Sequence, residues 1–213
     1  MGSFWKVKET FFPKGFLAHP LRKGNLTMKL LIASDIHGDA ACCRAMLDAA
    51  DRESVERILL LGDLLYHGPR NDLPLGYAPK EVIEMLNAAA DKLICVRGNC
   101  DTEVDQMVLS FPILSETAWV YDGEAKLSLF MSHGHKFSPD SLPPLPSGTV
   151  FLYGHTHLLG IVEKDGVTCI NPGSVSLPKN NNPKTYGVYN GGVFEIKELD
   201  GAVVERYDLR KNA

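Results

Sequence analysis

Five short polar segments of the sequence contain side chains that can bind metal ions. They are SDIHG at 34–38, GD at 62–63, GNCD at 98–101, SHGH at 132–135 and GHTH at 154–157. Carboxylate, amide and imidazole groups suit Mn, Fe, Co, Ni and Zn rather than Ca or Mg alone. One such segment by itself is more often structural, for example as a helix cap or a turn. Five of them in one chain indicate a metal cluster.

Two of the segments carry ligand-type residues at a spacing of two. Asp35 and His37 form one such pair, and His155 and His157 form the other. In extended backbone, side chains two residues apart project to the same face. We therefore expect each loop to offer two ligands to the cluster.

The polar segments follow apolar runs that are typical of buried strands. Strands are predicted at 29–33, 58–61 and 93–96, with one helix capped by Asp39 and another beginning near Pro79. This βαβαβ order predicts parallel strands joined by crossover helices. Ligand sites in such sheets collect at the carboxyl ends of the strands, which is where the polar segments stand.

The second half of the chain has a different pattern. Runs at 118–121 and 126–131 flank a turn at Asp122-Gly123, and runs at 186–189, 193–196 and 203–207 alternate around glycine-containing turns. These patterns predict antiparallel hairpins. A mixed sheet, or two packed sheets with outer helices, would satisfy both halves.

Composition limits the function classes. The chain has 213 residues, 45% of them hydrophobic, and a net charge of −4, with acids and bases mixed along its length. We expect no duplex nucleic-acid partner and no membrane partner, because no basic patch that would bind DNA or an anionic membrane is evident. None of the five cysteines forms a CxxC pair, which favours reduced thiols in the cytoplasm.

Strong periodicity begins at Met28. Residues 1–27 scatter Lys, Glu and Pro among their apolar residues, so they contain neither a signal-peptide core nor a membrane span. We interpret 1–27 as an N-terminal extension, either upstream of a true start at Met28 or a flexible arm. Residues 28–213 are expected to form one domain.

The order DxH, GD, GN, H and GHxH resembles the calcineurin-like metallophosphoesterase superfamily. The stretch from Met28 to about Tyr189 resembles its YfcE-type bacterial phosphodiesterases, through DLLYHGPRN at 63–71, RGNCDTEVDQ at 97–106, YGHTH at 153–157 and NPGSVS at 171–176. The resemblance implies an α/β fold, a four-layer αββα sandwich of two mixed β-sheets flanked by helices. It also implies hydrolysis of a small phosphodiester by a hydroxide that bridges two divalent metal ions. Mn²⁺ is the expected metal, with Zn²⁺, Ni²⁺ and Fe²⁺ as alternatives.

The resemblance also implies a role for each ligand-type residue. Carried over by position, Asp35, His37 and His157 would hold one metal ion, Asn99, His133 and His155 the other, and Asp63 would bridge them. An anion between two dications is physically reasonable, because the cations lie only about 3.5–4 Å apart in such centres.

Cys100 departs from the family pattern. Most members have a histidine there, thought to protonate the leaving oxygen, with the next acidic residue holding it. The thiol could be a ligand, a nucleophile, a weak donor or an apolar filler. A thiolate would repel the substrate phosphate, so we favour a neutral thiol beside the substrate. Cys100, Asp101 and Arg97 are the expected catalytic neighbours, although a structural role is equally open for Arg97, as it is for His67 and Asn71.

Other functions remain open at this point. The same fold serves as a protein-binding scaffold in a retromer subunit that resembles these enzymes but has lost the metal chemistry, and a phosphomonoesterase or a nuclease would use the same centre. All seven ligand positions carry competent side chains in this sequence, which favours an enzyme. A homo-oligomer is left open.

Overall fold

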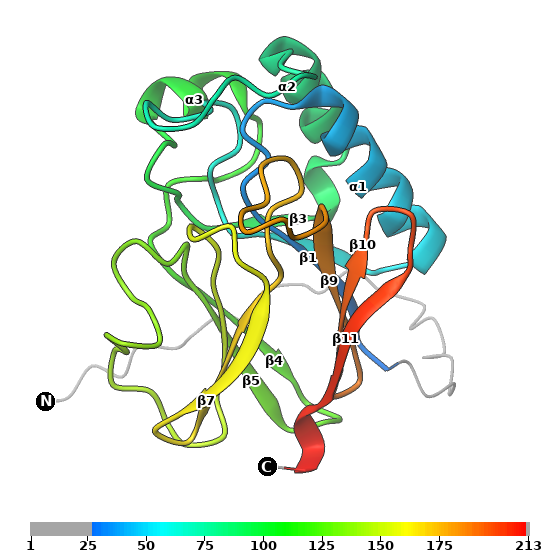
Figure 1. Cartoon of the computed structure of the whole chain (residues 1–213). Coiled ribbons are helices and arrows are strands. Elements are labelled where there is room, and N and C mark those ends of the chain that lie inside the picture. The colour runs from blue at the N-terminus through cyan, green and yellow to red at the C-terminus, as the bar shows by residue number, and fades with distance from the viewer. Residues whose placement is uncertain (1–26, 212–213) are drawn as a thin grey trace, which may run out of the picture.

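Two mixed β-sheets stack against each other in the computed structural model, which describes residues 27–211 (Figure 1). The first sheet contains β1 (Lys29–Ala33), β2 (Arg57–Leu60), β3 (Leu93–Cys95), β9 (Thr185–Asn190), β10 (Val193–Glu198) and β11 (Val203–Asp208). Its order is β11-β10-β9-β1-β2-β3, with β1, β2 and β3 parallel. The predicted parallel core and the C-terminal antiparallel hairpins are therefore both confirmed, and they share one sheet.

The second sheet contains parallel pairs that the hairpin interpretation omitted. Its strands are β4 (Ala118–Asp122), β5 (Leu127–Met131), β6 (Val150–Leu152), β7 (Gly160–Lys164) and β8 (Val167–Asn171), in the order β4-β5-β6-β8-β7. The β4–β5 hairpin is confirmed, but β6 pairs in parallel with both β5 and β8. The strand β6 has only three residues, all buried, so its short apolar run shows no period.

The helices lie where their end signals predict. They are α1 (Ala40–Glu53), α2 (Pro79–Ala88) and α3 (Glu103–Val108), with single 3₁₀ turns at Ala90–Lys92 and Leu209–Lys211. The Asp39 carboxylate accepts the N–H of Cys42 at 3.0 Å and caps α1, and Pro79 opens α2. Both α1 and α2 cover the first sheet (Figure 1).

Apolar side chains on both faces of the first sheet build two cores. Leu31 and Ala33 of β1 pack with residues of α1 and α2, whereas Leu30 and Ile32 pack with residues of the second sheet. Because neighbouring side chains of a strand point to opposite faces, a strand covered on both sides is apolar throughout. The carboxyl end of β1 is thus held rigidly between two packed layers.

A buried hydrogen bond joins the two sheets at the end where the β4–β5 hairpin turns. The Tyr189 hydroxyl, on β9, donates to Oδ2 of Asp122 at 2.7 Å. Oδ1 of the same carboxylate accepts the N–H groups of Glu124 and Ala125, both at 3.0 Å. Asp122 and Tyr189 are 2% and 0% exposed, so this contact lies inside the sandwich.

The two-sheet α/β sandwich is confirmed, and its fourth layer is a loop segment. The outer face of the second sheet presents Phe130 and Phe151, which pack against Leu142 and Leu145 of the segment 135–148. That segment contains no helix, and its run SLPPLPS at 141–147 explains why, since proline interrupts helical hydrogen bonding.

The expected extension at 1–27 lies outside the described residues except for Thr27. Within 27–211, no helix combines the length and the apolar composition that a membrane span requires.

Candidate metal centre

The ligand-type side chains come together at one end of the two sheets, on loops that leave the strands. The first sheet supplies residues after β1, β2 and β3, and the second supplies residues after β5 and β6. Ion-pair distances across the interface show that both sets meet, for example 3.3 Å between Asp35 Oδ1 and His157 Nε2. The set consists of Asp35, His37, Asp63, Asn99, His133, His155 and His157. The structure therefore brings together the loops that carry the predicted ligands.

The backbone of these loops is not extended, as the spacing argument assumed. Five of the seven residues have positive φ: Asp35 at 59°, His37 at 49°, Asp63 at 57°, His155 at 66° and His157 at 60°. Asp and His tolerate this left-handed region better than most residues, yet each such residue costs about 1–3 kcal/mol. The sharp loop geometry separates the second pair, so that His157 joins Asp35 and His37 while His155 lines the pocket wall.

Three imidazole rings are fixed in one tautomer by backbone carbonyls. Nδ1 lies 2.7 Å, 2.7 Å and 2.6 Å from the carbonyl oxygens of Tyr66, Leu61 and Leu177, in His37, His133 and His157 respectively. A carbonyl oxygen can only accept, so each Nδ1 carries a proton, and Nε2 is the nitrogen that presents a lone pair whenever the ring is neutral. This second hydrogen bond is typical of histidines that bind metal ions.

The first group of lone pairs converges on a point where no donor lies. Nε2 of His37 and Nε2 of His157 face each other at 3.2 Å. Asp35 Oδ1 lies 3.6 Å and 3.3 Å from these two nitrogens, and it is buried without a hydrogen-bond partner among the described residues. Three acceptors in mutual contact repel one another unless a cation lies between them. This donor set fits a divalent metal ion.

A second group surrounds His133 and shares Asp63 with the first. Nε2 of His133 lies 3.1 Å from Asn99 Oδ1 and 3.4 Å from Asp63 Oδ2. The Asn99 amide nitrogen donates to Cys100 Sγ at 3.2 Å, which turns the amide oxygen toward His133. Asp63 Oδ2 also lies 3.8 Å from Nε2 of His37. Asp63 therefore stands between the two groups.

The pKa values of the histidines and carboxylates also indicate that the centre favours a positive charge. Burial lowers the pKa of His37 and His155 below the usual range, so their rings are neutral near pH 7. Burial acts on His133 in the same direction, but the neighbouring Asp63 and Asp35 outweigh it and raise its pKa to about 9. Burial would raise the pKa of Asp35, yet the surrounding histidines hold it well below its ordinary value. The carboxylates stay ionised, and a bound cation would replace the proton on His133.

Asp101 holds the loops after β2 and β3 together. Its Oδ2 accepts the N–H groups of Asp63 and Gly98 at 2.8 Å and 2.7 Å, and its Oδ1 accepts that of Leu64 at 2.9 Å. Burial and the charge of Asp63 raise the pKa of Asp101 to about 6, although these hydrogen bonds oppose the rise. A Cβ added at Gly98 would collide with Asp63 and with Asp101 Oδ2. The glycine is needed because the two loops approach so closely.

The placement of Arg97 and Asp101 gives no support to the expected catalytic contacts. Arg97 Nε donates to the carbonyl oxygen of Asp101 at 3.1 Å, and its guanidinium lies 3.6 Å from Glu103. The Asp101 carboxylate is occupied by backbone N–H groups and lies 1% exposed. Neither residue lines the pocket over the metal-type ligands. In the structure Asp101 fixes the backbone of Asp63 and Arg97 contacts the backbone of Asp101, while a direct catalytic role for either residue stays a prediction.

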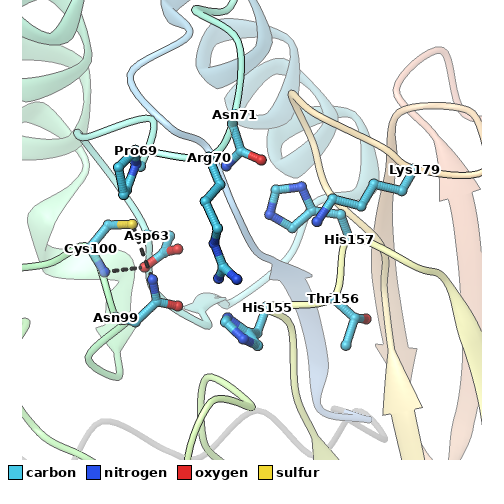
Figure 2. A pocket seen from close by; sticks show the side chains of 11 residues that line it. Asp63, Pro69, Arg70, Asn71, Asn99, Cys100, His155, Thr156, His157 and Lys179 are labelled. Atoms are coloured by element: carbon cyan, nitrogen blue, oxygen red, sulfur yellow. Dashed lines mark hydrogen bonds between the residues drawn. The ribbon is translucent and has the colours of Figure 1, made fainter.

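A cavity of about 350 Å³ opens above the centre. Figure 2 shows Cys100 and Asn99 on one wall, and His155, Thr156 and His157 on the other. Burial raises the pKa of the Cys100 thiol, and the charge of Asp63 adds to this, so the thiol is neutral. Arg70 and Lys179 also line the cavity. The sequence left the neighbouring His67 and Asn71 undecided and gave no signal for Lys179.

Comparison with known proteins gives consistent relatives. Residues 28–191 match the calcineurin-like phosphoesterase superfamily domain. Phosphodiesterase YfcE of Escherichia coli K12 is 46% identical over 173 residues, which cover 81% of this chain and 93% of YfcE. The solved structure of YfcE, a phosphoesterase from E. coli, matches with a TM-score of 0.82 and 44% identity over 85% of this chain and 100% of that chain. Vps29 of Entamoeba histolytica matches with a TM-score of 0.54 and 24% identity over 85% of this chain and 99% of its own, which shows a shared fold alone.

Proposed function

The chain belongs to the calcineurin-like phosphoesterase superfamily, and from this membership we propose that it is a metal-dependent phosphodiesterase with two divalent cations. In this proposal Asp35, His37 and His157 hold one cation, Asn99, His133 and His155 hold the other, and Asp63 bridges them. One observation carries the proposal: acceptor atoms converge with no donor among them. The Nε2 atoms of His37 and His157 lie 3.2 Å apart, and Asp35 Oδ1 beside them is buried with no hydrogen-bond partner among the described residues.

The bound cations would supply a hydroxide nucleophile at neutral pH and would offset the charge on the phosphoryl oxygens. The protein's own residues set the geometry. Asp63 keeps its carboxylate in place by accepting the Cys100 N–H at 2.8 Å and by the hold of Asp101 on its backbone. The Cys100 thiol stands at the pocket wall as a neutral group and a poor acid. The expected substrates are therefore esters whose leaving groups depart without needing a proton.

The protein-binding scaffold is the alternative from another class, and the completeness of the ligand set speaks against it. A scaffold has no reason to keep three histidines in the metal-binding tautomer around a partnerless carboxylate oxygen. We prefer a diester to a monoester, because phosphodiesterase YfcE is 46% identical to this chain. A small diester as partner, Mn²⁺ as metal and a cytoplasmic location belong to the same proposal. The five free cysteines are consistent with that location.

The test starts from protein stripped of metal by a chelator. Mn²⁺, Zn²⁺, Ni²⁺ and Fe²⁺ are then added in turn, and hydrolysis of bis-p-nitrophenyl phosphate is compared with that of p-nitrophenyl phosphate. We expect no activity without metal, restored activity with at least Mn²⁺, and faster turnover of the diester. Hydrolysis that persists in excess chelator would contradict the proposal.

A variant adds the residue-level test. Asp63→Asn removes the charge between the two cations, so we expect loss of turnover and about one fewer metal ion per chain by elemental analysis. The control is Asp165→Asn, because Asp165 lies in the exposed β7–β8 turn, away from the centre. Normal metal content and normal turnover in Asp63→Asn would rule out the bridging role.

A further inference from the structure

Two cationic side chains line the cavity without a protein partner. Arg70 and Lys179 are exposed, and within residues 27–211 neither side chain makes a hydrogen bond or an ion pair. Figure 2 shows the Arg70 guanidinium reaching into the cavity between Asn99 and His155, and Lys179 lying beside His157. Asp63, a proposed metal ligand, is the one acid in the lining. These two cations therefore face space that an anion can occupy.

The turn that carries Arg70 is fixed by its neighbours. The Asn71 amide donates to the carbonyl oxygen of His67 at 2.7 Å, and the His67 ring packs edge-on against Tyr66 and Tyr77. Gly68 has a φ of 82°, and a Cβ there would lie 3.3 Å from Cys100 Sγ, so the turn sits directly against the centre. The adjacent Tyr66 carbonyl holds His37. These contacts fix the position of the turn and therefore the point from which the Arg70 guanidinium extends into the cavity.

The loop that carries Lys179 is fixed to another proposed ligand. The Lys179 N–H donates to the carbonyl oxygen of His157 at 3.2 Å, and the Leu177 carbonyl holds the His157 ring. Asn180 and Asn181 then take positive φ values of 57° and 59°, which turn the chain back at once. Lys179 thus stands two residues after Leu177, and Arg70 four residues after Tyr66, and the carbonyls of Leu177 and Tyr66 orient His157 and His37.

The charges in the site exceed what a simple diester requires. Two dications would bring four positive charges, of which Asp35 and Asp63 balance two. The proposed hydroxide and a phosphodiester each bring one negative charge at neutral pH, so together they balance the centre and leave the charges of Arg70 and Lys179 without compensation. A planar guanidinium and an ammonium together suit a phosphate group, which accepts several hydrogen bonds. Neither cation has a counter-ion unless the substrate brings one.

We propose that the substrate is a phosphodiester that carries a second phosphate group, and that Arg70 and Lys179 bind this second group. The inference rests on the proposed function, because it takes the metal centre as the place of the scissile diester. It adds a substrate class, and it assigns specificity to two residues that hold no metal.

Binding tests the proposal without any turnover. Isothermal titration calorimetry with the metal-loaded protein compares the Kd of thymidine 3′,5′-bisphosphate with that of thymidine 5′-monophosphate. We expect the bisphosphate to bind about tenfold tighter or more, well above the factor of two that arises because either phosphate can occupy the centre. Raising the ionic strength from about 0.05 M to about 0.5 M should shrink this preference, because salt screens exposed cations.

Variants assign the preference to residues. Arg70→Gln and Lys179→Gln should each reduce the preference severalfold, and the double variant should abolish it. The matched control is Lys164→Gln, because Lys164 is an exposed lysine at the end of β7, outside the cavity lining. Equal binding of the two nucleotides by the parent protein, or a full preference in the double variant, overturns the inference.

Kinetics separates this inference from the proposed function. The p-nitrophenyl ester of thymidine 5′-phosphate is compared with the same ester carrying a 3′-phosphate. We expect a lower KM for the ester that carries the 3′-phosphate. Arg70→Gln and Lys179→Gln should each reduce kcat/KM more for that ester than for the ester without the 3′-phosphate. If neither ester is hydrolysed with any metal, the proposed function fails while the titration still decides the binding preference. If both are hydrolysed with equal KM, the proposed function stands and this inference fails.

Discussion

Replacing Gly98 with alanine places a methyl group where the two ligand loops meet. The new Cβ would collide with the backbone nitrogen and carboxylate of Asp63 and with Oδ2 of Asp101. These atoms belong to a buried, hydrogen-bonded cluster and have no free rotation by which to withdraw. The loop after β2 and the loop after β3 must therefore move apart, and the movement separates Asp63 from Asn99.

The size of the effect follows from the contacts that are lost. Overpacking a tight site costs about 1–3 kcal/mol. Lengthening the hydrogen bonds from Gly98 to Asp101 and from Cys100 to Asp63 adds about 1–2 kcal/mol, because both acceptors are buried carboxylates. We expect a total loss of about 2–5 kcal/mol in unfolding free energy. For a chain of this size, that lowers the Tm by about 4–20 °C. Displacing the support of the ligands should also weaken metal binding about 10–100-fold.

The assay measures thermal unfolding by circular dichroism, first without metal and then with Mn²⁺, together with metal content by elemental analysis. The metal-free Tm isolates the packing cost from the loss of bound metal. The matched control is Gly123→Ala in the β4–β5 turn, where the new Cβ meets only Tyr121, at 3.8 Å. The unfolding free energy of Gly123→Ala should stay within about 0.5 kcal/mol of that of the parent protein. A Gly98→Ala variant with the Tm and metal content of the control would refute the reasoning.

Three further changes test other parts of the structure. Tyr189→Phe removes the donor to the buried Asp122 carboxylate and should cost about 1.5–3 kcal/mol in urea unfolding at pH 7; a loss below 0.5 kcal/mol would mean that water replaces the hydroxyl. Burial would raise the pKa of Glu53, but the hydrogen bond from Lys197 holds it below its ordinary value of 4.5. The stability that Glu53 adds over Glu53→Gln should therefore be complete above about pH 4.5 and should vanish as the pH falls further, whereas a difference that grows in acid would reverse the assigned sign. Cys100→His brings a group with a pKa of about 6.5 in place of a neutral thiol, so it should speed esters with basic leaving groups by about 10²-fold. A plot of rate against leaving-group pKa measures this, and an unchanged slope would exclude general acid catalysis by the new residue.

The parts of the fold set by local signals were predictable. Asp39 as a helix cap, Pro79 as a helix start and the alternation around the Asp122-Gly123 turn depend on neighbours in the sequence, and the structure confirms all three. The parallel pairing of β6 with β5 and β8 was not predictable, because partners in a parallel sheet are chosen by contacts distant in the sequence. The two-sheet sandwich implied by the resemblance is confirmed, and the loop character of the outer segment at 135–148 agrees with the prolines visible in its sequence.

The candidate site divides in the same way. The residues after each apolar strand were correctly expected to meet, since parallel strands deliver their carboxyl ends to one edge. The left-handed backbone at Asp35 and His157 gave no signal, because the sequence shows no glycine there. Arg70 belongs to a turn that packs against Cys100, and Lys179 belongs to a loop that is held to His157, so no periodicity could place them. Which residues bind metal stays a prediction until metal content is measured.

Different contacts join the two sheets at the two ends of the sandwich. At the hairpin end, Tyr189 and Asp122 fasten one sheet to the other with a permanent hydrogen bond. At the opposite end, Asp35 of the first sheet and His157 of the second would be fastened by a cation that can leave. Without a cation, the apolar core and the hydrogen bond from His133 Nδ1 to the Leu61 carbonyl oxygen still join the two sheets at this end. The cation would therefore add a removable fastening to a contact that the protein already makes.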